Sequence, residues 1–207
     1  MNRLIGIMAD SHGDLYALKA GVALLTKMGC SVLYHLGDIC DSTRPDTVEP
    51  CLDVMRNHGV LAVKGNNEHA VFVNFSEGGS MILSDACAQF LKALPLVRQW
   101  SDAVFTHSLP FERELGLSAM VRTMGDMEAM AFFETHPHSI LFRGHSHIPG
   151  VVRLENKKSV SVPVNCGEYV ELEWKRPCIV TCGALIDGVC MVWDTDSDRV
   201  FFLDGVS

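Results

Sequence analysis

Apolar and polar positions alternate in blocks along the first half of the chain, as expected of a layered α/β fold. Short apolar runs typical of buried strands cover residues 5–9, 32–35 and 60–63. Patterns with helical spacing cover residues 14–28, about 46–57 and 84–94, and each stops near a glycine or before a proline. Ser84 is a good N-cap for the last of these helices. This alternation predicts helices packed against a sheet.

The second half of the chain is β-rich. Beyond Leu141 the helical period disappears, and short apolar runs lie between turn residues. The expected strands cover residues 151–154, 159–164, 178–181, 189–193 and 199–203. The two halves together predict an α/β fold in which two sheets pack face to face with helices outside. A chain of 207 residues with 48% hydrophobic content can form one substantial core, so we expect a single domain over residues 1–207.

Residues 116–135 carry methionines close to helical spacing. These are Met120, Met124, Met127 and Met130. Such a segment can be a lid or a binding surface, but methionine is also an adaptable filler of hydrophobic cores. Core packing is the interpretation that the pattern favours.

Five short polar fragments each follow an apolar run that reads as a strand. They are Asp10-Ser11-His12, Gly37-Asp38, Gly65-Asn66-Asn67-Glu68, Thr106-His107 and Gly144-His145-Ser146-His147. Loops at strand ends project side chains to one edge of a sheet, so residues far apart in sequence can converge there. The fragments supply two aspartates, four histidines and one asparagine. These oxygen and imidazole donors suffice for two divalent cations that share a bridging carboxylate.

The order of the fragments resembles the calcineurin-like metallophosphoesterase superfamily, whose pattern runs Asp-x-His, Gly-Asp, Gly-Asn-His-Asp/Glu, His and Gly-His-x-His. The resemblance covers residues 5–147 and implies two packed mixed β-sheets flanked by helices, an α/β/β/α sandwich. It implies that the first cation is bound by Asp10, His12, Asp38 and His147. It implies that the second cation is bound by Asn66, His107, His145 and the shared Asp38.

The resemblance implies metal-dependent hydrolysis of phosphate esters, with Asp38, Asn66 and His107 as the catalytic residues. Two cations about 3.5–4 Å apart would lower the pKa of a bridging water and polarise the phosphoryl oxygens, without a protein nucleophile. The mixed nitrogen and oxygen donors suit Mn, Fe, Zn, Ni or Co. Glu68 is a candidate to orient the imidazoles; a plain surface or capping glutamate is the equal alternative.

The chain departs from the family pattern after the metal-binding asparagine, where Asn67 replaces the usual histidine. An amide cannot act as a general acid near neutral pH, so a contribution of about 10²- to 10⁴-fold is missing or comes from elsewhere. His69 could substitute, although on an extended segment it would share the face of Asn67. Arg44 could bind a substrate phosphate with two hydrogen bonds, or it could simply be solvated. Asn67 and Arg44 are the expected substrate-binding residues.

Composition limits the range of partners. The formal charge of −8 disfavours a sequence-independent grip on nucleic acid duplexes. No apolar run reaches the length of about 18 residues that a membrane-spanning helix needs. We expect no signal peptide, because the first strand starts close to Met1, and we expect the eight cysteines to be reduced thiols, mostly in the core. We therefore expect a cytoplasmic protein that acts on a small phosphate ester or nucleotide.

A protein-interaction scaffold with the same fold is the alternative function. The full set of metal-binding residue types disfavours it, because a scaffold has no chemical need for them. Asn67 is the feature that keeps this alternative open. The native metal, the physiological substrate and the oligomeric state are not determined by the sequence.

Overall fold

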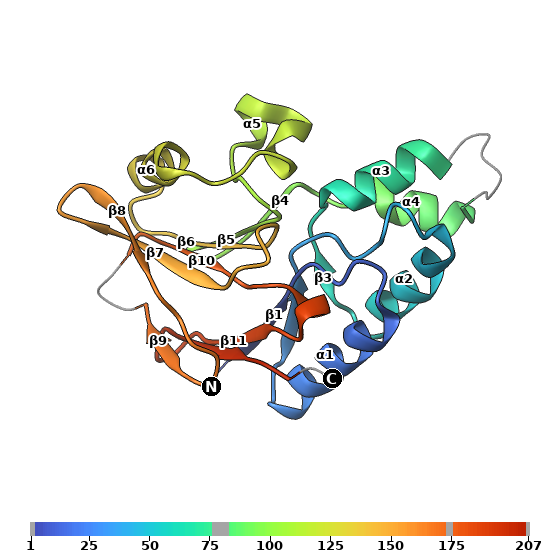
Figure 1. Cartoon of the computed structure of the whole chain (residues 1–207), viewed down its shortest axis with the longest axis horizontal. Coiled ribbons are helices and arrows are strands. Elements are labelled where there is room, and N and C mark those ends of the chain that lie inside the picture. Colours follow the sequence, from blue (N-terminus) through green and yellow to red (C-terminus); the bar gives the residue numbers. More distant parts are fainter. Residues whose placement is uncertain (1–2, 76–82, 173–175, 206–207) are drawn as a thin grey trace.

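The structure is a computed structural model and describes residues 3–75, 83–172 and 176–205. Two six-stranded mixed sheets form its centre (Figure 1). The first sheet has the order β3 (Leu61–Ala62), β2 (Val32–His35), β1 (Leu4–Met8), β11 (Cys190–Asp194), β12 (Arg199–Leu203) and β9 (Tyr169–Glu171). The second sheet has the order β4 (Val97–Trp100), β5 (Ala103–Thr106), β6 (Ile140–Arg143), β10 (Cys178–Thr181), β7 (Gly150–Glu155) and β8 (Lys158–Val162).

Helices cover the outer face of each sheet (Figure 1). On the first sheet they are α1 (Leu15–Lys27), the 3₁₀ turn η1 (Pro45–Thr47), α2 (Val48–Asn57), α3 (Asn66–Phe75) and α4 (Asp85–Ala93). On the second sheet they are α5 (Glu112–Leu115), η2 (Gly116–Met120) and α6 (Asp126–Thr135), and η3 (Leu185–Asp187) follows β10. The predicted sandwich of two mixed sheets flanked by helices is confirmed.

The core follows from the alternation of side chains along the strands. In β1, Ile5 and Ile7 point between the two sheets, where they join Phe105 and Phe142. Met8, on the opposite face, packs against the helices outside the first sheet. A smaller cluster joins α6 to the outer face of the second sheet. The central strands of both sheets are therefore buried on two faces, which explains why they read as nearly continuous apolar runs.

Most of the predicted elements are confirmed, several with identical bounds. The strands 32–35, 178–181 and 199–203 match the structure. Ser84 caps α4 and accepts a hydrogen bond from the backbone N–H of Cys87 at 3.3 Å, as expected. The prediction for 46–57 was right for α2, but its first turn is the 3₁₀ segment η1. The strands β4 and β9 were missed, because both lie at sheet edges and lack a long apolar run.

The segment 116–135 contains η2, a connecting loop and α6 rather than one helix. Met120 is buried, so core packing is confirmed there. Met127 is 80% exposed, and for this residue core packing was wrong. No helix within the described residues is long and apolar enough to cross a membrane.

Candidate metal centre

The five polar fragments converge at one edge of the sandwich. β1, β2 and β3 run parallel to one another, as do β5 and β6, so their carboxyl ends share an edge of each sheet. Backbone hydrogen bonds join the loops directly. The N–H of Asp10 donates to the carbonyl of Gly37 at 3.0 Å, and the N–H of His12 donates to the carbonyl of Asp38 at 2.9 Å. The loop after β1 is thus fixed against the loop after β2.

One group of donor atoms is formed by Asp10, His12, Asp38 and His147. The Nε2 atoms of His12 and His147 lie 3.0 Å apart. Asp10 Oδ1 lies 4.0 Å from His12 Nε2 and 3.7 Å from His147 Nε2, and Asp38 Oδ2 lies 3.9 Å from His12 Nε2. Ligands of a single cation with bonds of about 2.0–2.2 Å lie about 3–4 Å apart. These separations fit one divalent ion.

A second group of donor atoms is formed by Asn66, His107, His145 and Asp38. His107 Nε2 lies 3.1 Å from Asn66 Oδ1, 3.1 Å from His145 Nδ1 and 3.6 Å from Asp38 Oδ1. Asp38 therefore presents one carboxylate oxygen to each group. The structure thus brings all seven predicted ligands to one edge of the sandwich, where the donor atoms of Asp10, His12 and His147, and those of Asp10, Asp38 and His107, lie within 4.8 Å of one another.

Five of the seven residues have a positive φ, a conformation that side chains other than glycine rarely adopt. They are Asp10 at 55°, His12 at 45°, Asp38 at 54°, His145 at 71° and His147 at 61°. Strained backbone of this kind clusters at functional sites, where the surrounding structure maintains it. Here the interlocking loop hydrogen bonds and the buried strands beneath them do so.

The glycines of the fragments are required by close approach. A Cβ at Gly37 would lie 2.9 Å from His107 Nδ1, and one at Gly144 would lie 2.6 Å from Asp10 Oδ2. A Cβ at Gly65 would collide with Asp38. Each glycine therefore lets two ligand loops touch.

The donors fit a cation chemically as well as geometrically. Asp10 is fully buried, and its Oδ1 atom has no hydrogen-bond partner among the described residues. Burial raises the pKa of Asp10 to about 8, and the nearby Asp38 carboxylate adds to the effect. Burial also lowers the pKa of His107 to about 4, which favours the neutral imidazole that can bind a metal. A buried carboxylate oxygen that accepts no hydrogen bond, beside a neutral imidazole, belongs to a donor set that a divalent cation would complete.

Comparison with known families agrees with this geometry. The calcineurin-like phosphoesterase superfamily domain matches residues 4–185. The chain belongs to this superfamily.

Individual relatives of this phosphoesterase domain are distant in sequence. An uncharacterized protein of Methanocaldococcus jannaschii is 24% identical over 165 residues, which are 72% of this chain and 64% of that protein. The match thus spans less than two thirds of that relative's length. A metallophosphoesterase from Sphaerobacter thermophilus aligns over 99% of this chain and 88% of its own, with a TM-score of 0.76 and 22% identity. A hypothetical protein from Pyrococcus horikoshii aligns over 97% and 87%, with a TM-score of 0.63 and 12% identity. Both structures have the same fold.

Glu68 holds the loops of the candidate metal centre together. It is fully buried, so the alternative of a surface glutamate was wrong. Its Oε2 accepts hydrogen bonds from the N–H groups of Asp38 and Gly65, both at 2.8 Å, and its Oε1 accepts one from Cys40 at 2.9 Å. Glu68 does not orient the imidazoles as suggested. Its hydrogen-bond partners are backbone N–H groups of two ligand loops. Burial raises its pKa to about 7, and Asp38 contributes in the same direction.

Asn67 and His69 lie on α3, which begins at Asn66. The side-chain amide of Asn67 donates to Asp38 Oδ2 at 2.7 Å, and its oxygen accepts from the N–H of Ser42 at 3.0 Å. The expectation of an extended segment was wrong. Residues two apart on a helix are about 200° apart around its axis, so His69 does not share the face of Asn67.

The arginines near the site bond to the protein itself. Arg44 donates through Nε to Asp41 at 2.8 Å and through Nη2 to the carbonyl of His12 at 2.7 Å. Arg143 is buried and donates to the carbonyl of Ser108 at 3.2 Å and to the hydroxyl of Thr181 at 3.2 Å. Arg44 thus braces a ligand loop, and its contact with substrate, like that of Asn67, stays a prediction.

Sequence reasoning missed the groups that orient the histidines. His107 Nδ1 lies 2.8 Å from the carbonyl of Leu36, so its N–H donates there and Nε2 is left facing Asp38 and Asn66. Asp187 Oδ2 lies 3.7 Å from His147 Nδ1. No sequence signal identifies a carbonyl partner, and Asp187 reaches the site only because η3 follows β10 at the same edge.

Proposed function

We propose that this chain hydrolyses phosphate esters with two divalent cations, bound by Asp10, His12, Asp38 and His147 and by Asp38, Asn66, His107 and His145. The observation that carries the proposal is the Asp38 carboxylate, whose two oxygens face different histidines at 3.9 and 3.6 Å. When bound, such a cation pair would activate water for attack on phosphorus and stabilise the negative charge that develops on the phosphoryl oxygens.

The protein's own residues hold and orient these groups. Asp10, Asp38 and Glu68 bring three carboxyl groups into a largely buried region, and their negative charges, when ionised, would balance the charge of bound divalent cations. The neutral Asn66 amide leaves the second group of donors less negative than the first. Asn67 donates to Asp38 and has no acidic proton near neutral pH, so it does not protonate a leaving group. The proposal therefore favours esters whose leaving groups have a low pKa.

The substrate is proposed to be a small phosphate ester or diester, and manganese is the first metal to test. The proposed location is cytoplasmic. One structural relative is described as an archaeal phosphodiesterase, with a TM-score of 0.51 and 14% identity over 98% of this chain and 99% of that one. That description motivates diester substrates in the assay.

The test removes metals with a chelator and restores Mn²⁺, Zn²⁺, Ni²⁺ or Co²⁺ one at a time. We expect hydrolysis of p-nitrophenyl phosphate or bis-p-nitrophenyl phosphate only after a metal is added. Asp38→Asn should abolish turnover and lower the bound metal, whereas Asp196→Asn, at an exposed turn, should behave as the wild type. Wild-type turnover by Asp38→Asn would refute the assigned roles. No metal-dependent turnover of either ester or of nucleotides would favour the scaffold alternative.

A further inference from the structure

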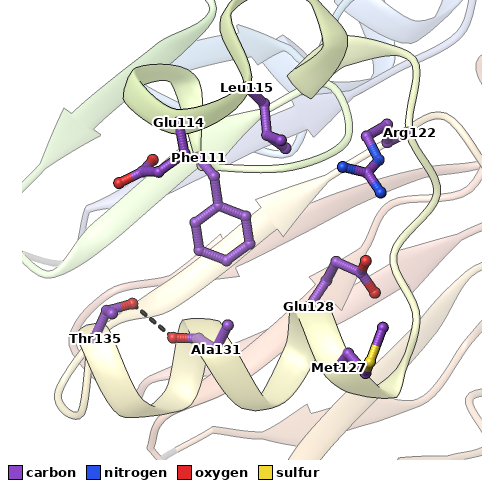
Figure 2. A pocket seen from close by; sticks show the side chains of 8 residues that line it. All are labelled: Phe111, Glu114, Leu115, Arg122, Met127, Glu128, Ala131 and Thr135. Atoms are coloured by element: carbon purple, nitrogen blue, oxygen red, sulfur yellow. Dashed lines mark hydrogen bonds between the residues drawn. The ribbon is translucent and has the colours of Figure 1, made fainter.

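An apolar groove lies between α5 and α6, outside the second sheet (Figure 2). We call it the α5–α6 groove and define it by Phe111, Leu115, Met127 and Ala131, with a volume of about 410 Å³. Phe111 projects into its middle from the start of α5, above the exposed face of α6 (Figure 2). This volume falls within the range of about 300–1,000 Å³ that is typical of small-molecule sites.

The charged residues of the groove disfavour an anionic occupant. Glu114, Arg122 and Glu128 line it, and Arg122 and Glu128 face each other across it (Figure 2). Two carboxylates against one guanidinium leave the lining with an excess negative charge. A phosphate group would be repelled, whereas an uncharged apolar group would bury apolar surface against Phe111 and Met127.

The wall of the groove is connected to the candidate metal centre. Arg122 lines the groove with its side chain, while its carbonyl accepts a hydrogen bond from the hydroxyl of Ser108, the residue after His107. Arg122 therefore contacts the loop of the predicted ligand His107 through its backbone and the groove through its side chain.

We propose that the α5–α6 groove binds the uncharged apolar group of a phosphodiester whose phosphate lies at the candidate metal centre. This inference rests on the proposed function and names the substrate class for it. Arg44 and Arg143 donate to protein atoms, so the surroundings of the donors offer a single phosphate little additional positive charge. An ester with one phosphate and an apolar substituent suits this distribution better than a polyphosphate or a phosphoprotein.

The experiment uses methyl, butyl and hexyl p-nitrophenyl phosphates with the metal-loaded protein. The leaving group is the same in all three, so differences report on the alkyl group. We expect kcat/KM to rise with chain length, by a factor of about four per buried methylene at most, mainly through a lower KM. A flat chain-length profile for the wild type would overturn the inference.

Met127→Glu places a charge on the exposed rim of the groove without touching the core. Val73→Glu is the matched control, because Val73 is 58% exposed on α3 and the substitution adds the same charge. Met127→Glu should lower the ratio of kcat/KM for the hexyl and methyl esters about tenfold. Val73→Glu should leave this ratio as in the wild type. An unchanged ratio in Met127→Glu would contradict the inference.

A binding measurement separates this inference from the proposed function. Dihexyl phosphate has two poor leaving groups, so its binding can be measured by calorimetry without hydrolysis. We expect it to bind the manganese-loaded protein, with an affinity at least about fivefold lower for Met127→Glu. If no p-nitrophenyl ester is hydrolysed but dihexyl phosphate still binds in this way, the proposed function is refuted and the groove remains a binding site. If the methyl ester is hydrolysed but dihexyl phosphate does not bind, only the role of the groove is refuted.

Discussion

Replacing Glu68 by glutamine tests how far the metal centre depends on a buried carboxylate that holds its loops. The wild-type carboxylate accepts three backbone hydrogen bonds at 2.8–2.9 Å, from Asp38, Gly65 and Cys40. In Glu68→Gln the amide oxygen can keep the two bonds of Oε2, but the NH₂ group then faces the N–H of Cys40. A buried N–H without an acceptor costs about 1–3 kcal/mol.

This cost falls on the arrangement that the ligands need. If the whole cost of about 1–3 kcal/mol reduces the free energy of metal binding, the affinity for the metal falls about 5- to 150-fold, because about 1.4 kcal/mol corresponds to a factor of ten. The range agrees with the loss of about 10- to 100-fold expected when a partner of metal ligands is removed. We therefore expect Glu68→Gln to bind Mn²⁺ about 10- to 100-fold more weakly, with a folded structure.

Calorimetric titration of chelator-treated protein with Mn²⁺ measures this effect. Glu134→Gln is the matched control, because Glu134 is exposed on α6 and its replacement removes the same charge from the surface. Circular dichroism of both metal-free variants checks that they are folded. A Glu68→Gln affinity for Mn²⁺ within twofold of the wild type would contradict this prediction, because the hydrogen bonds to both loops would then have no influence on the donors.

Three further predictions follow from particular contacts. Asn67→His should retain metal and raise turnover of esters with poor leaving groups relative to p-nitrophenyl esters, because an imidazole can donate a proton; equal gains for both would contradict this. Burial raises the pKa of Asp10 from 3.8 to about 8. In the metal-free protein the uncharged Asp10 carboxyl therefore favours the folded state at low pH, and this contribution to the free energy of unfolding is lost as the pH rises through 8. Urea unfolding with a chelator should show less stability at pH 8.5 than at pH 7, and less of this difference in Asp10→Asn. Ser84→Ala removes the cap of α4 and should lower the free energy of unfolding by about 1 kcal/mol in the same assay; an unchanged value would show that the cap contributes nothing.

The candidate ligands could be located in the sequence because they lie directly after buried strands. An apolar run such as 32–35 can be recognised without knowing its neighbours, and a polar residue behind it must leave the sheet at its carboxyl end. Local preferences also determined the α4 cap at Ser84, since a capping hydroxyl needs only its own helix. These features depend on residues close together in the chain.

The contacts of Glu68 could not be predicted from local sequence patterns. It bonds to Asp38 and Cys40, 30 and 28 residues away, and its burial depends on how two loops meet. The start of α3 at Asn66 was missed because the residues before it, Lys64 and Gly65, show no capping signal and the helix is held by packing against α4. The α5–α6 groove, formed between residues 111 and 135, likewise exists only once α6 packs on the second sheet.

The α/β architecture and the seven candidate donors could be predicted from the amino-acid sequence, because strand periodicity and strand-end chemistry are local properties of the chain. Only the folded structure shows that the two Asp38 oxygens face different histidines, that Glu68 is buried between two loops, and that Met127 lines an open groove. Distances of 3–4 Å between side chains over 100 residues apart, such as His12 and His147, depend on how the two sheets are packed together, and no local pattern encodes that packing.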